Sequence, residues 1–94
     1  VSGGVMGAEN ATLTFMVGGP ADAFHRAEPI LRQMGRAAIH CGEAGAGQAA
    51  KACNNMMLAA TMIVTCEAFV LAEKLGLSHQ ALFEVASKSS GQSW

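Results

Sequence analysis

Charged residues are scarce in this sequence: they make up 14% of its 94 residues, with six cations against seven anions. A nearly neutral chain offers no broad basic surface, so the composition argues against binding to nucleic acid through its phosphates. Aromatic residues are also few, at 5%, whereas hydrophobic residues reach 51%. Such an apolar chain is unlike a disordered one, and its length is that of one small domain.

Several patterns that would carry chemistry are missing as well. The three cysteines are odd in number and form no CxxC pair, so we expect free, buried thiols in an intracellular protein: Cys41, Cys53 and Cys66. The three histidines do not have the spacing of metal ligands: His25, His40 and His79. We also find no Ser/His/Asp or Cys/His arrangement that would indicate nucleophilic catalysis.

The glycines at Gly42, Gly45 and Gly47 resemble a dinucleotide-binding loop only superficially. Their spacing is GxxGxG, whereas the fingerprint is GxGxxG and follows the first strand of a βαβ unit. We therefore interpret them as a tight turn from a strand into a helix.

The remaining pattern predicts an α/β segment followed by an all-α segment. Residues 1–10 read as a loop, and alternation with β-branched residues predicts strands at 11–17 and 37–41. Between them, helical spacing runs from Pro20 to Gly35, and Pro29 should kink or split that helix. The change to helix at Gly42–Gly47 suggests a domain boundary.

A long helix is predicted from about Ala46 to Leu75. It carries no charge between Lys51 and Glu67 and is apolar on every face at 56–64, which is typical of a helix buried on all sides. A membrane span is the competing interpretation, but the apolar window is short and interrupted by asparagine and threonine. Gly76 is expected just past the helix end, and Ser78 as the cap of a further helix to about residue 87.

Lys51 and Asn55 are the strongest candidates for chemistry. They are four residues apart, so they lie on one helix face near its start. A lysine there is the wrong sign for a helix N-terminus, and its apolar neighbourhood disfavours the ammonium form, as a lysine general acid or base requires. A lysine reaching to water is the competing explanation, and the residues alone favour neither. Asn54 faces elsewhere and reads as structural.

The Ser2-Gly3-Gly4 segment offers a hydroxyl and closely spaced backbone N–H groups. Such a nest suits a carboxylate or another anion, although this segment is also typical of an ordinary loop.

Taken together, four segments resemble the β-hydroxyacid dehydrogenases, in particular those acting on 3-hydroxyisobutyrate. They are VSGG at 1–4, LTFMVGG at 13–19, GEAGAGQAAKACNN at 42–55 and SSGQSW at 89–94. The resemblance covers the whole chain. It implies oxidation of a short β-hydroxy acid to its semialdehyde, with NAD or NADP accepting the hydride.

The resemblance also implies roles for individual residues. Lys51 matches the catalytic general acid/base, and Asn55 matches a substrate-binding amide. Ser2, Gly3 and Gly4 match the loop that binds the substrate carboxylate, and Trp94 matches a residue near the substrate pocket. The cofactor-binding fingerprint and the residue that separates NAD from NADP find no match here, so the cofactor-binding residues stay unassigned.

On this resemblance, residues 1–44 are the end of a Rossmann-type NAD(P)-binding domain. Residues 45–94 are a long interdomain helix and the start of a helical dimerisation domain. The ends of the chain suggest an internal piece of a longer protein, which alone would be inactive and partly unfolded, or would associate through its long helix. The whole protein is expected to be a homo-oligomer, cytoplasmic or, in a eukaryote, in the mitochondrial matrix.

Two alternatives remain open at this point. One is a sister enzyme that reduces tartronate semialdehyde or succinic semialdehyde. The other is a non-catalytic helical association module.

Overall fold

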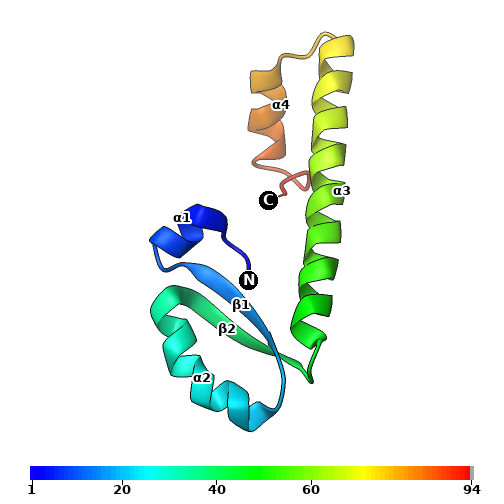
Figure 1. Ribbon diagram of the computed structural model, residues 1–94. Coiled ribbons are helices and arrows are strands. Elements are labelled where there is room, and N and C mark those ends of the chain that lie inside the picture. Colours follow the sequence, from blue (N-terminus) through cyan, green and yellow to red (C-terminus); the bar gives the residue numbers. More distant parts are fainter. Residues whose placement is uncertain (94) are drawn as a thin grey trace. The chain divides into compact units, whose positions relative to one another are not determined.

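The computed structural model describes residues 1–93, and Trp94 lies outside the described residues. Its elements, in chain order, are α1 (Gly4–Glu9), β1 (Leu13–Gly18), α2 (Ala21–Met34), β2 (Gly35–Gly42), α3 (Ala46–Lys74) and α4 (His79–Ala86) (Figure 1). The expected strand, helix, strand, long helix and helix are all present in that order, after the additional helix α1. The chain divides into two compact units, 1–54 and 55–94, so the division falls inside α3.

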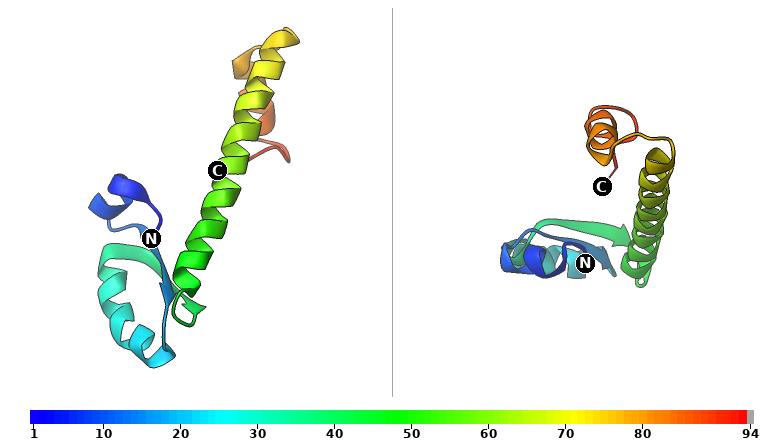
Figure 2. Two further views of the ribbon diagram at one scale, coloured as in Figure 1. Left: turned by 45° about the vertical axis from the view of Figure 1, so that its right-hand side comes forward. Right: turned by 90° about the horizontal axis from the view of Figure 1, so that it is seen from above.

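The first unit is a βαβ motif. β1 and β2 pair in parallel, with Phe15 opposite Ala38 and Val17 opposite His40, and α2 connects them (Figures 1 and 2). Phe24 of α2 and Ala38 of β2 are buried, so the small core of this unit lies between the helix and one face of the sheet. A parallel pair needs such a crossover, and the helix covers the face that it crosses.

The helix α2 continues through Pro29, so the predicted split is wrong. Proline removes the bond that its N–H would donate to the carbonyl four residues earlier, at His25. Both positions are exposed, so that carbonyl can bond to water instead. Two hydrogen bonds that span Pro29, in which Arg32 Nε and Nη2 donate to Glu28 Oε1 at 3.0 and 2.8 Å, link the two halves of the helix.

The predicted loop at 1–10 is wrong in its second half, which forms the short helix α1. Gly3 and Gly4 have φ values of 134° and 61°, and these two positions turn the chain from an extended segment into the helix. Ser2 bonds on both sides to Thr14, with N···O distances of 2.9 Å in each direction. Glycines that looked like loop residues therefore begin a helix.

The predicted signals between α3 and α4 are confirmed. Gly76 has φ 78° just past α3, and the Leu77 N–H donates to the Ala72 carbonyl at 2.9 Å. This is the bonding of a Schellman helix end. Ser78 then caps α4, accepting a bond from the Ala81 N–H at 3.2 Å.

The prediction that α3 is buried on all sides is wrong for the chain as it stands. Met56 is 71% exposed and Val64 65%, and Ala72 is the only buried hydrophobic residue among the described part of the second unit. Sequence shows that a helix face is apolar, but burial also needs neighbouring elements to cover it. By length and composition alone, α3 could also cross a membrane.

The cysteines were expected to be free and buried. All three are free, but Cys53 and Cys66 are exposed on α3 and Cys41 is half-buried in β2. The expectation of burial failed for the same reason as for α3, because it assumed that the apolar helix was covered.

Candidate functional site: the cleft at Lys51

Lys51 lies in the second turn of α3, half-buried, and lines a cleft of about 660 Å³ in the first unit. The other walls come from the N-terminus, the end of β1, the middle of α2 and the first turns of α3: Val1, Met16, Val17, Gly18, Ala27, Leu31, Gly47, Gln48 and Ala52. Lys51 is the one charged side chain among these lining residues. The cleft therefore presents a single charged side chain, that of Lys51, to an otherwise largely apolar space.

The position of Lys51 depends on a close approach between α3 and the end of β1. A Cβ atom added at Gly47 would meet the Met16 carbonyl oxygen and lie 3.1 Å from the Gly18 nitrogen. One added at Gly18 would lie 2.7 Å from the Glu43 carbonyl oxygen. Only glycines allow these backbones to touch. Lys51 stands one helical turn after Gly47, on the same face.

The proposed carboxylate loop begins beside this cleft. Val1 lines the cleft directly, and Ser2 follows it, anchored to Thr14 of β1 by the paired backbone bonds. Gly3 and Gly4 are exposed and have positive φ. The structure thus brings the first residues of the chain to the same space as Lys51, which sequence separation alone could not show.

The remaining predicted site residues are Asn55 and Trp94. Asn55 follows Lys51 by one turn of α3 and is exposed, whereas Asn54 is half-buried. The prediction for Trp94 falls outside the described residues.

Sequence reasoning missed the residues that support the cleft. The strand predicted at 11–17 stopped short of Gly18 and Gly19, and His40 was considered only as a possible metal ligand. The signal that could have revealed the first two is the glycine pair at the end of β1, together with Gly47 in the first turn of α3.

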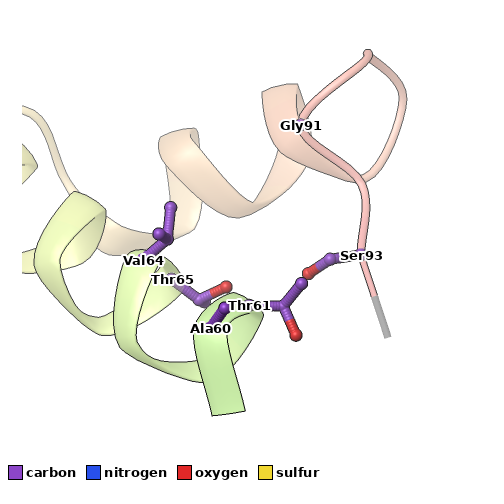
Figure 3. Close-up of a pocket in the computed structure, with 6 residues that line it drawn as sticks. All are labelled: Ala60, Thr61, Val64, Thr65, Gly91 and Ser93. Carbon is purple, nitrogen blue, oxygen red and sulfur yellow. The ribbon is translucent and has the colours of Figure 1, made fainter. Parts of the chain in front are cut away.

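A second pocket, of about 300 Å³, lies in the second unit (Figure 3). It is lined by Ala60, Thr61, Val64, Thr65, Gly91 and Ser93. The Thr61 hydroxyl is within 3.1 Å of the Met57 carbonyl and 2.9 Å of the Leu58 carbonyl, so its hydrogen is already engaged by the helix backbone. This pocket offers a mainly apolar surface with few free donors.

Two protein-family models match the chain. Residues 45–94, just over half of it, match the family described as NAD-binding of NADP-dependent 3-hydroxyisobutyrate dehydrogenase. Residues 1–45 match the NAD binding domain of 6-phosphogluconate dehydrogenase.

Individual relatives agree with these matches. A probable 3-hydroxyisobutyrate dehydrogenase of Mycobacterium tuberculosis is 61% identical over all 94 residues, which are 32% of its length. A solved structure of the M. tuberculosis 3-hydroxyisobutyrate dehydrogenase with L-serine matches 99% of this chain and 32% of that chain, at 60% identity and a TM-score of 0.93. An NAD-dependent L-serine dehydrogenase of Pseudomonas aeruginosa is 51% identical over the whole chain and 32% of its own length.

The chain thus spans about a third of the length of the curated relatives that it matches. Relatives from Arabidopsis thaliana and Homo sapiens are named mitochondrial proteins. Together with the parallel βαβ unit and the long helix after it, these findings place the sequence: the chain belongs to the family of NAD-binding domains of the 3-hydroxyisobutyrate dehydrogenases.

Proposed function

We propose that this chain is part of an NAD(P)-dependent oxidoreductase that oxidises 3-hydroxyisobutyrate, or a similar short β-hydroxy acid, to its semialdehyde. The observation that carries the proposal is the position of Lys51, the sole charged side chain lining a cleft that also receives the start of the chain. The family match and the identity to named 3-hydroxyisobutyrate dehydrogenases support the same reaction class.

In the proposed reaction, the Ser2 hydroxyl and the N–H groups of Gly3 and Gly4 bind the substrate carboxylate. The amide of Asn55 orients the substrate, and Trp94 is proposed to lie near its pocket. Lys51 takes the proton of the substrate hydroxyl as the carbon beneath it loses a hydride, which leaves an aldehyde. NAD(P), when bound, accepts that hydride.

The described residues contain no GxGxxG strand–loop–helix, so they supply no cradle for the pyrophosphate of a dinucleotide. The cleft at Lys51, with one charged side chain and glycine-lined backbone, suits a hydroxy acid instead. We therefore propose no cofactor-binding residues in this chain. NAD and NADP are both compatible with the family descriptions.

Substitution of Lys51→Ala in the full-length protein tests the proposal. We expect kcat for 3-hydroxyisobutyrate to fall by about 10²- to 10⁴-fold, the usual contribution of a general acid or base, while nucleotide affinity changes little. Lys74→Ala is the matched control, because it removes the same charge from the exposed far end of the same helix. Unchanged turnover in the Lys51 variant would remove this residue from the mechanism.

L-Serine is a second candidate substrate, favoured by one specific observation. A 51%-identical relative is named an NAD-dependent L-serine dehydrogenase, and the solved M. tuberculosis structure was determined with L-serine. Serine has the same β-hydroxy acid core, so the proposed roles of Lys51 and Ser2 are unchanged. Comparing kcat/KM for 3-hydroxyisobutyrate, L-serine and the reduced forms of tartronate and succinic semialdehydes would rank these substrates.

We further propose the domain division at residues 44 and 45, with a Rossmann-type segment before it and the interdomain helix after it. The meeting of the two family matches at residue 45 supports it, whereas the compact units divide ten residues later, between Asn54 and Asn55 of α3. The exposed apolar surface of α3 supports a homo-oligomer formed through the helical part. A monomeric mass for the full-length protein by light scattering would contradict this.

We also propose that α3 is covered by protein and not by lipid. Its polar residues at Asn54, Asn55 and Thr61 support this, as does its membership of a dehydrogenase family. We place the protein in the cytoplasm or, in a eukaryote, in the mitochondrial matrix. Full-length protein that sediments with membranes and needs detergent for release would contradict both statements. A non-catalytic association module remains the alternative if Lys51 proves dispensable.

A further inference from the structure

His40 makes contacts that neither the fold nor the proposed reaction explains by itself. Its Nε2 lies 2.7 Å from the Gly19 carbonyl oxygen, and because a carbonyl can only accept, Nε2 carries the proton and donates. Its ring stacks on Phe24, with ring centroids 5.1 Å apart and planes at 12°. Phe24 is itself buried in α2. The imidazole therefore has one fixed orientation between α2 and the end of β1.

Gly19, which provides the acceptor, makes hydrogen bonds to β2 through both its backbone N–H and its backbone carbonyl. Its N–H donates to the Gly42 carbonyl at 2.9 Å, and its carbonyl accepts from His40. Gly19 also has φ 143°, a conformation that a residue with a side chain rarely adopts. Two hydrogen bonds therefore hold Gly19 against β2. One joins it to the backbone of Gly42, and the other joins it to the side chain of His40.

The first turn of α3 packs against the Gly18–Gly19 turn. Gly18, the residue before Gly19, touches the first turn of α3 so closely that a Cβ on it would lie 2.9 Å from the Gly47 nitrogen. A contact between two backbones has no flexible side chain to absorb a shift. Any displacement of the Gly18–Gly19 turn is therefore passed to Gly47, and from there by one rigid helical turn to Lys51.

From this chain of contacts we infer that His40 is a positioning residue for Lys51. It acts by holding the Gly18–Gly19 turn against which α3 starts. The inference rests on the proposed function, because it assigns His40 a role only if Lys51 handles the substrate proton.

Two substitutions in the full-length protein test the hydrogen-bond donor of His40 separately from its aromatic ring. Both His40→Leu and His40→Gln replace the ring with a side chain of similar size. Only glutamine keeps a donor that can reach the Gly19 carbonyl. We expect the leucine variant to lose about tenfold in kcat, since misplacing a reacting group by about 1 Å can cost about 100-fold. The glutamine variant should return to within about threefold of the natural enzyme, and KM for the nucleotide should change in neither.

The control is Lys51→Ala, measured alongside, with thermal midpoints recorded for every variant. A leucine variant with unchanged kcat, or leucine and glutamine variants that lose the same kcat, would overturn the inference while leaving the role of Lys51 intact. A kcat loss in the leucine variant that tracks its fraction of unfolded protein would also overturn it. Full turnover in Lys51→Ala would overturn both the inference and the proposed function.

Discussion

Replacing Gly47 by alanine sets two opposing effects on the stability of α3 against each other. In an open helix, alanine is more favourable than glycine by about 1 kcal/mol. At Gly47, however, the new Cβ would meet the Met16 carbonyl oxygen and lie 3.1 Å from the Gly18 nitrogen. Both are backbone atoms at the end of β1, where Met16 and Gly18 are paired with β2.

The clash should exceed the helix gain. Adding one carbon to a well-packed site costs about 1–3 kcal/mol, and the upper end applies because backbone atoms cannot rotate away. Subtracting the gain of about 1 kcal/mol leaves a net loss of about 2 kcal/mol. For a large chain, at about 2 °C per kcal/mol, this lowers the thermal midpoint by about 4 °C.

Circular dichroism at 222 nm during heating of the full-length protein measures this shift. Ala49→Gly, an exposed position in the same part of α3, is the matched control and should lose about 1 kcal/mol through helix propensity alone. We also expect Gly47→Ala to lower kcat, because Lys51 moves with the helix. A raised midpoint in Gly47→Ala, which an uncrowded helix would give, would refute the close approach and the account of how Lys51 is positioned.

Two further changes test the helix boundaries by thermal or denaturant unfolding of the full-length protein. Pro29→Ala restores a helical N–H in the exposed middle of α2 and should raise the free energy of unfolding by about 1–3 kcal/mol. A lower free energy of unfolding would show that something other than water accommodates the proline. Gly76→Ala has open space for its Cβ but φ 78°, so it should cost about 1–2 kcal/mol through the left-handed backbone alone. Gly76→Asn should cost less, and equal costs would contradict that explanation.

Local signals explain why the order of elements was predictable. The caps at Gly76 and Ser78 act through bonds to residues three to five positions away, so their effect is visible in the sequence. The helix α1 was missed because Gly3 and Gly4, which signal a turn, stand at the start of the helix and not in a loop. Pro29 was misjudged because its cost depends on whether a carbonyl faces water.

The candidate site was predictable in part. Lys51 stood out because no other charge occurs in α3 before Glu67, and its place in a cleft accords with that. The support beneath it was not predictable, because Gly18 meets Gly47 and His40 meets Gly19 only after β1, β2 and α3 have come together. The burial of α3 was overestimated, since an apolar face does not reveal what covers it.

By itself, the sequence determined the local elements, the spacing of Lys51 and Asn55 on one helix face, and the resemblance to a dehydrogenase family. Each of these depends on residues close together in the chain or on an ordered set of motifs. The tertiary structure alone decided that Val1 and Lys51 line one cleft and that two glycines let α3 rest on the end of β1. Those contacts join residues far apart in the chain, and such pairings exist only once the βαβ unit has closed.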